Sequence, residues 1–266
     1  MRLLAPIDAA PDAPLARANP LAKLAAALVL LVALFVSLDA VTAGVILIGL
    51  VLVVPFAGIP VPALLRRTWL IGLAAAIVGI VNVVFAAEQL GPMVVSFGPL
   101  RIGAETLLNG VGLALRLLAI GLAGVLATAT SQPTEMADAL TQHLRVPPRF
   151  ALGALAALRL VPLLVAEWQL IGMARRARGV DAGHSPAALV GLWVGRVATL
   201  LVRAVRRASR LALAMDARGF GALPHRTNAR VSRVRPSDWA WVAGAAALGA
   251  GALAVSVAVG AWRPLV

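Results

Sequence analysis

Two copies of an Ala-x-x-Ala-Arg-Gly pattern hold the side chains with the clearest capacity for chemistry in this chain. They read Ala174-Arg175-Arg176-Ala177-Arg178-Gly179 and Ala214-Met215-Asp216-Ala217-Arg218-Gly219. A guanidinium carries five donors in a fixed fork and stays charged, so Arg178 and Arg218 can bind carboxylates and carbonyls of a partner. The following glycine lets another backbone approach closely. The pattern also suits a plain helix end, because arginine complements the helix dipole and glycine adopts the left-handed terminating conformation.

The placement of the two copies favours partner contact over capping alone. Each copy closes a long segment predicted to be helical, and both lie in the most basic part of the chain. A six-residue match at two consecutive helix ends is more than the abundance of Ala, Arg and Gly would give by chance. We therefore predict partner-binding sites formed by Ala177, Arg178, Gly179, Ala217, Arg218 and Gly219.

Other reactive groups are few. The chain has no cysteine, and its three histidines, His143, His184 and His225, match no metal-binding spacing. The single lysine, Lys23, has no glycine-rich phosphate loop around it, so any ATP must be bound by another chain. We expect no catalytic residue, no metal and no cofactor.

The composition is that of a membrane protein. The 266 residues are 61% hydrophobic and only 13% charged, with a mean hydropathy of +0.93. Soluble domains carry about 25% charged residues. Long unbroken Ala, Leu and Val runs favour spanning helices over a barrel.

The positive charge is concentrated in one region. The net charge is +13, and residues 132–236 hold sixteen of the 24 basic and five of the 11 acidic residues, a net charge of +11. Arg17, Lys23, Arg66 and Arg67 flank the first apolar runs. The positive-inside rule then predicts a cytoplasmic N-terminus.

The elements that must position the arginines follow from these runs. Apolar segments long enough to span occur at about 21–37, 41–57, 68–87, 107–130 and 239–262. The predicted fold is an all-α, polytopic helical membrane protein with about five transmembrane helices and a cytoplasmic coupling-helix domain inserted before the last span. The domain boundaries are 1–131, 132–236 and 237–266.

Three helices are expected inside residues 132–236. Ser131 is a candidate cap for a short helix that reaches about Leu144. A longer helix should run from Pro148 to Arg178, broken or bent at Pro162, and a third from about Ala187 to Arg218.

The last of these helices is amphipathic. Helical spacing places Arg196, Arg203, Arg207, Arg210 and Arg218 along one line and Val194, Ala198, Leu201 and Val205 opposite. Two arrangements stay open: the helix lies at the membrane surface with its arginines toward phosphates or cytoplasm, or it packs its apolar face on a partner helix and presents charge to another protein.

Two charged residues need partners. Arg116 lies inside the fourth apolar run, where a helix-packing role is favoured over a place on a substrate pathway. Glu167 is expected to pair with Arg159 or Arg175.

Several motifs, in this order, resemble one known family. They are Asn19-Pro20-Leu21-Ala22-Lys23-Leu24, Thr128-Ala129-Thr130-Ser131-Gln132-Pro133, Leu158-Arg159-Leu160-Val161-Pro162 with Glu167, both Ala-Arg-Gly ends, Arg206-Arg207-Ala208, Leu211-Ala212-Leu213-Ala214-Met215 and Arg226-Thr227. The chain resembles the transmembrane T component of energy-coupling factor (ECF) transporters, which are ABC-type importers. Asn19 stands where the family has aspartate.

The resemblance implies a function and partners. A T component links two cytosolic ABC ATPases to a membrane-embedded substrate-binding S component for vitamin or transition-metal uptake, and ATP is bound by the ATPases. Arg178 and Arg218 would end two crossing coupling helices and enter grooves of the ATPases, with a supporting region of Arg159, Pro162, Glu167, Arg207 and Met215. Relative motion of the two helices would transmit hydrolysis.

Three alternatives fit the residues less well. An integral-membrane lipid-modifying enzyme needs clustered carboxylates, and the acidic residues here are scattered. A secondary transporter should have inverted repeats and broken helices, and the first four apolar runs show little of either. A nucleic-acid-binding protein would not interleave its arginines with apolar helix faces.

Overall fold

The chain forms two compact units. The structure, a computed structural model, describes residues 10, 12–86, 91–97, 100–180, 185–221, 228 and 230–262. Unit 1 comprises Met1–Leu144 and Ser232–Val266, and unit 2 comprises Arg145–Val231. His184, His225 and the Arg226-Thr227 pair lie outside the described residues.

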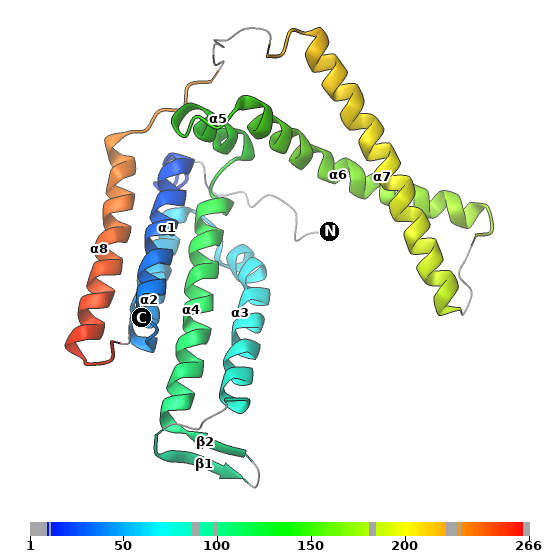
Figure 1. Ribbon diagram of the computed structural model, residues 1–266. Helices are drawn as coiled ribbons and strands as arrows, with labels where there is room; N and C mark the ends of the chain where they lie inside the picture. The colour runs from blue at the N-terminus through cyan, green and yellow to red at the C-terminus, as the bar shows by residue number, and fades with distance from the viewer. Residues whose placement is uncertain are drawn as a thin grey trace. The chain divides into compact units, whose positions relative to one another are not determined.

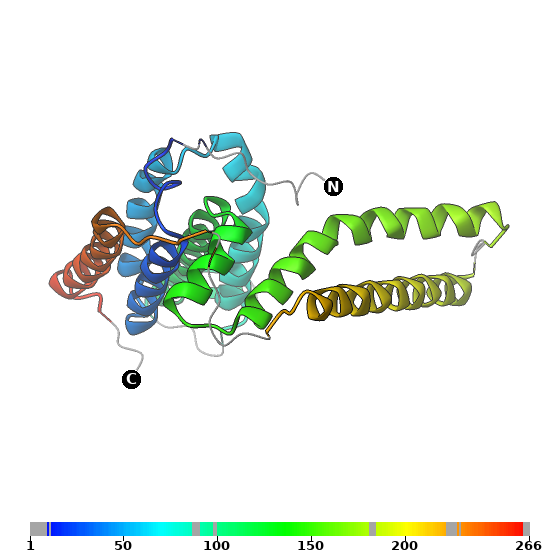
Figure 2. The same cartoon turned by 90° about the horizontal axis from the view of Figure 1, so that it is seen from above.

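Unit 1 is a helical bundle with a small hairpin at one end (Figure 1). Its helices are α1 (Pro20–Val36), α2 (Ala40–Val53) with the 3-10 turn η2 (Val54–Ala57), α3 (Val61–Val84), α4 (Ala104–Ala129), α5 (Pro133–His143) and α8 (Pro236–Ala258). The strands β1 (Met93–Phe97) and β2 (Leu100–Gly103) pair antiparallel just before α4. Seen along the bundle in Figure 2, α4 lies among α1, α2 and α3, while α8 covers α1 and α2.

Local sequence sets the helix starts. Proline occupies the first turn of α1, α3, α5 and α8, where its missing N–H would have no helical partner and its fixed φ suits the helix. Asn19 and Asp39 cap α1 and α2, because their side chains accept from the backbone N–H of Leu21 and Thr42.

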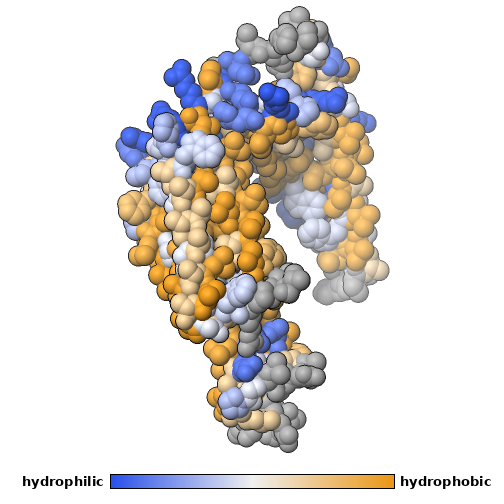
Figure 3. Space-filling view, turned by 60° about the vertical axis from the view of Figure 1, so that its left-hand side comes forward, coloured by the Kyte–Doolittle hydropathy of each residue, from blue (hydrophilic) through white to orange (hydrophobic). Residues whose placement is uncertain are grey.

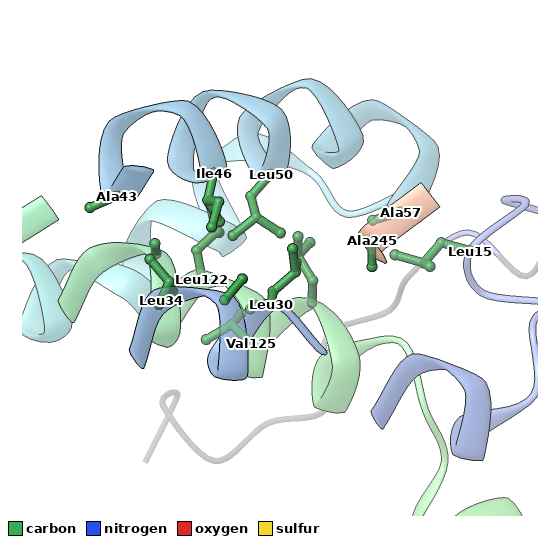
Figure 4. Close-up of a cluster of buried hydrophobic side chains, with 14 of the residues drawn as sticks. Leu15, Leu30, Leu34, Ala43, Ile46, Leu50, Ala57, Leu122, Val125 and Ala245 are labelled. Atoms are coloured by element: carbon green, nitrogen blue, oxygen red, sulfur yellow. The ribbon is translucent and has the colours of Figure 1, made fainter. Parts of the chain in front are cut away.

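The core of unit 1 is aliphatic. Leu30 and Leu34 of α1 meet Ile46 and Leu50 of α2 and Leu122 of α4 (Figure 4). Small residues bring helices together elsewhere: a Cβ on Gly79 of α3 would lie 3.0 Å from the Gly110 carbonyl oxygen of α4. Close approach at small residues is typical of helices that associate in membranes, where packing replaces the hydrophobic effect.

A buried polar cluster joins helix ends within that core. Arg116 of α4 is buried and donates to the Ser37 carbonyl at the end of α1. The Ser37 hydroxyl donates to Asp39, whose other carboxylate oxygen accepts from the Thr42 N–H at 2.7 Å. Arg116 therefore ties α4 to the connection between α1 and α2.

The outer surface of unit 1 is apolar along its flanks. Large side chains of α3, among them Leu65, Trp69, Leu73, Ile77 and Ile80, are exposed. Figure 3 shows hydrophobic residues along the bundle and hydrophilic ones gathered toward the end where α8 begins. Such a surface matches a lipid environment.

Unit 2 consists chiefly of two long helices, α6 (Pro148–Ala177) and α7 (Pro186–Ala217). Within the described residues, six helices are long and apolar enough to cross a membrane: α2 with η2, α3, α4, α6, α7 and α8. The α1 helix is apolar but shorter, at 17 residues. These helices confirm the predicted all-α polytopic membrane protein.

The described helices that are long and apolar enough to cross a membrane number six rather than about five, and they include α6 and α7 but not α1. Three further details also differ from the sequence predictions. The α3 helix begins at Val61, because Pro62 starts a helix that carries Arg66 and Arg67 as well as the apolar run. The β1–β2 hairpin was not expected. Ser131 is not the cap of α5: its hydroxyl donates to the Ala127 carbonyl one turn back in α4, and Gln132 takes the N-cap position.

Candidate partner-docking site

The two Ala-Arg-Gly ends have the same backbone geometry. Arg178 caps α6 at φ −91° and ψ 9°, and Arg218 caps α7 at φ −90° and ψ 10°. Gly179 and Gly219 both follow at φ +71°, in the left-handed region. A residue with a Cβ is strained there, so each glycine is required by the turn itself.

The same pair of hydrogen bonds closes each end. Val180 N donates to the Arg175 carbonyl and Gly179 N to the Arg176 carbonyl, each at 3.0 Å. At the second end, Phe220 N donates to the Met215 carbonyl at 3.0 Å and Gly219 N to the Asp216 carbonyl at 2.9 Å. This is the Schellman arrangement, which satisfies the last carbonyls of a helix.

The ends satisfy their own backbones and leave their side chains to solvent. The alanines, arginines and glycines of both ends are exposed, namely Ala177, Arg178, Gly179, Ala217, Arg218 and Gly219. Each end therefore presents a guanidinium on a rigid turn with a glycine beside it. That arrangement can bind a carboxylate or helix carbonyls in a groove of another protein.

Glu167 pairs across the two helices of unit 2. Its carboxylate accepts from Arg203 at 3.2 Å and lies 3.9 Å from Arg207, both on α7. The expected pairing with Arg159 or Arg175 was wrong, because both of those lie on α6 with Glu167, whereas the facing helix supplies closer guanidinium groups. Arg159 is exposed, and Arg175 instead donates to the Leu192 carbonyl at 3.1 Å.

The amphipathic helix α7 faces α6 with its basic side. Arg203 and Arg207 meet Glu167, while Val194, Leu201 and Val205 are more than half exposed. The sequence left two arrangements open, with the arginines either at the membrane surface or presented to another protein. Neither of them describes the contact of Arg203 and Arg207 with Glu167 of α6.

The other supporting residues have separate places. The α6 helix continues through Pro162, so it is not broken there, and Pro162 itself is exposed. Met215 and Arg207 are half-buried on α7, and the Met215 carbonyl closes the second Schellman turn. Arg159, Pro162 and Met215 are thus not gathered around Glu167.

A polar junction within unit 1 was missed from the sequence. Ser232 N donates to the Gln142 side chain at 2.8 Å, and the His143 ring nitrogen Nε2 lies 3.1 Å from the Ser232 carbonyl oxygen. Asn19 donates through Nδ2 to the Ser232 hydroxyl at 3.0 Å and through its backbone N–H to Asp238 at 3.1 Å. We call Asn19, Gln142, His143, Ser232 and Asp238 the base junction.

The base junction gives the Asn19 motif a structural role. Asp238 is buried and also accepts from the Arg235 N–H at 2.7 Å. Lys23, one turn into α1, is buried and donates to the carbonyls of Thr130 at 2.8 Å and Ala16 at 3.2 Å. The motif marked these residues as important, but no local pattern indicated partners more than 100 residues away.

Metal chemistry finds no support in the described part of the chain, where no group of three or more His, Asp or Glu side chains could hold an ion.

Comparison with known proteins decides the family. A family model described as CbiQ, cobalt transport protein, matches residues 12–229. The chain belongs to the CbiQ family. The match covers all of unit 2 as far as Ala229 and most of unit 1, so both Ala-Arg-Gly ends and the base junction's Asn19 fall inside it.

Curated relatives agree with this assignment. The chain is 34% identical over 164 residues to energy-coupling factor transporter transmembrane protein EcfT 1 of Listeria monocytogenes, covering 57% of this chain and 59% of that protein. It is 34% identical over 152 residues to EcfT of Bacillus subtilis, covering 53% and 56%. The match to EcfT of Heliobacterium modesticaldum is longer, 30% identical over 244 residues, with 86% and 88% covered.

These matches confirm the predicted resemblance to T components. They also confirm that the chain is a multi-pass, non-catalytic membrane protein of the transport class rather than an enzyme. The chain spans little more than half the length of several of the curated relatives it matches.

Proposed function

We propose that this protein is the energy-coupling scaffold of an ECF-type importer. In this proposal it links two cytosolic ABC ATPases to a membrane-embedded S component that takes up a vitamin or a transition-metal ion. The observation that carries the proposal is the pair of Schellman ends with matching geometry, each presenting an exposed arginine. Two equal docking elements on one chain suit two ATPase subunits.

Charge and surface support the assignment of partners. Residues 132–236 carry most of the net positive charge, which favours the cytoplasmic side for the two ends and for the N-terminus. On α7 the outward face of Val190, Val194, Val197, Leu201 and Val205 is exposed and apolar. An apolar S component is the occupant that suits this face, because leaving it in water would be costly. ATP binding falls to the ATPases.

The test is co-purification of the tagged chain with its candidate ATPases. We expect the Arg178→Glu and Arg218→Glu double variant to lose at least about tenfold in ATPase capture, since each substitution replaces a charge-assisted contact by repulsion. The matched control is Arg149→Glu with Arg210→Glu, which reverses two exposed arginines on the same helices outside the turns. The control should retain capture.

Two outcomes oppose the proposal. Equal capture by the double variant and the native chain would reduce the Ala-Arg-Gly ends to helix caps. Failure of the native chain to retain any ATPase, under conditions that keep ECF importers assembled, would turn attention to the lipid-modifying enzyme.

A further inference from the structure

The contact between α6 and α7 contains two arginine–glycine pairs of opposite direction. Arg175 of α6 lies over Gly195 of α7, where an added Cβ would come 2.8 Å from Arg175 Nη2 and 2.9 Å from Nη1. Arg196 of α7 lies over Gly172 of α6, where a Cβ would come 3.6 Å from Arg196 Nη1. Each helix thus contributes one arginine and receives the other helix's arginine on a bare backbone.

Glycine is what allows each guanidinium to lie against the opposing helix. The flat, weakly hydrated guanidinium packs well on a surface without side chains. Arg175 Nη1 also donates to the Leu192 carbonyl at 3.1 Å, using the lone pair that a helical carbonyl keeps free after its own helical hydrogen bond. An added Cβ at position 195 would force the Arg175 guanidinium to move from its present place.

Further contacts continue the same interface toward the N-terminal part of α6. The rings of Trp168 and Trp193 lie with centroids 5.1 Å apart and planes tilted by 44°, a favourable aromatic arrangement. The Glu167 carboxylate with Arg203 and Arg207 lies further along α7. The two arginine–glycine pairs therefore lie at the α6 end of a contact that also contains an aromatic pair and an ion pair.

The position of these pairs gives them leverage over the two Ala-Arg-Gly ends. Arg175 precedes Arg178 by less than one helical turn, so the contact adjoins the first end. Gly195 precedes Arg218 by 23 residues, about 35 Å of helix at 1.5 Å per residue. A change of about 5° in the crossing angle would then move the second end by about 3 Å.

We infer that Arg175 with Gly195 and Arg196 with Gly172 form a crossing lock that sets the angle between α6 and α7 and so positions one docking end relative to the other. The inference rests on the proposed function for its purpose, but the lock itself is a property of this chain alone. These four are positioning residues, since none of them is among the six exposed residues of the ends and the Arg175 side chain faces α7.

The lock is tested by distance measurement between the helices. The native chain has no cysteine, so spin labels at Arg176→Cys and Ser209→Cys, both exposed, report the α6–α7 geometry in lipid nanodiscs. We expect a narrow distance distribution in the otherwise native chain, and a shifted or at least twofold broader one in Gly195→Val. The matched control is Gly191→Val, one turn earlier on α7, where an added Cβ would meet no described atom within 4 Å.

A second variant separates the lock from misfolding. Arg175→Met keeps the length and the apolar stem but loses the donors to Leu192, so it should change the distribution without altering the protein's detergent-extracted yield. Unchanged distributions in both Gly195→Val and Arg175→Met would overturn the lock.

Functional readouts keep the lock distinct from docking. With the lock broken, each ATPase should still be captured, because both arginine ends are intact, while ATP-driven uptake falls at least about tenfold. Loss of capture in the lock variants would instead mean that Arg175 or Gly195 itself touches an ATPase, and would overturn the positioning role. If the Arg178→Glu and Arg218→Glu variant still captured the ATPases, the proposed function would be wrong. The spin-label distances between α6 and α7 would still support the lock.

Discussion

Asp39 shows how a single buried carboxylate is kept ionised in unit 1. Burial by itself raises the pKa of this group, but hydrogen bonds from the Ser37 hydroxyl and the Thr42 N–H outweigh it and hold the pKa of Asp39 below its ordinary value. A carboxyl whose pKa is lower in the folded than in the unfolded state stabilises the fold when ionised. That stabilisation is complete above the unfolded pKa.

The resulting pH dependence is testable. We expect stability to fall as the pH drops from about 4, the ordinary carboxyl pKa, through the lower pKa of folded Asp39. Asp39→Asn should lower the free energy of unfolding by about 1–3 kcal/mol at neutral pH. It should also weaken the fall in stability at acid pH, which we call the acid limb. Thermal unfolding in detergent between pH 3 and 7 measures both effects. Asp12→Asn, at a side chain that is 87% exposed, should leave the curve unchanged, and an unaltered acid limb in Asp39→Asn would refute the assignment.

Residue identities were easier to predict than residue partners. The arginine ends were visible from the sequence because a repeated pattern marks them. The partner of Glu167 was not, since helical periodicity says which face a residue occupies but not which helix crosses that face. The same limit hid the pairing of Asn19 with Ser232 and Asp238.

At the scale of elements, the two Schellman turns make glycine necessary where α6 and α7 end. Substituting Gly179 by alanine forces a Cβ into the left-handed region at a cost of roughly 1–2 kcal/mol. In this variant we expect amide exchange at positions 179 and 180 to be about fivefold to thirtyfold faster than in the native chain. Hydrogen–deuterium exchange on peptides that cover the end of α6 would measure this.

Another glycine on the same helix supplies the control. Gly153 lies in the interior of α6, and an added Cβ would meet no described atom within 4 Å. Gly153→Ala should therefore stabilise the helix by roughly 0.5–1 kcal/mol. Equal effects of the two substitutions would show that the left-handed turn is not what holds the end.

Element types followed from the sequence more closely than element boundaries did. Long apolar runs predicted α1, α2, α4 and α8 well. The start of α3 was missed by seven residues because Arg66 and Arg67 interrupt the apolar run without interrupting the helix. The β1–β2 hairpin is too short to give a clear alternating pattern.

At the scale of the whole molecule, the face of α7 that packs on α6 could not have been derived from the amphipathicity of α7. Either face of such a helix can be buried, and amphipathicity alone does not show that Arg203 pairs with Glu167 of α6. The family, by contrast, was accessible because its motifs extend from Asn19 to Thr227 in a fixed order.

The base junction has a consequence for how this chain is built. Because Gln142 and His143 bind Ser232 directly, the polypeptide leaves unit 1 and returns to it at neighbouring points. Unit 2 is therefore an insertion in the topological sense, and α8 completes a bundle whose other helices all precede the insertion. In chains of this kind, one inserted unit can be replaced by another without changes to the unit that carries it.

A deletion tests this modularity. Replacing residues 145–231 by a short Gly-Ser linker should leave a membrane bundle that still unfolds cooperatively, since its core and polar contacts come from unit 1 alone. The same deletion with Ser232→Pro, which removes the N–H that binds Gln142, should be clearly less stable. A deletion variant that fails to fold even with the junction intact would contradict the idea. If it folds, unit 2 can be transplanted as a cassette between related hosts.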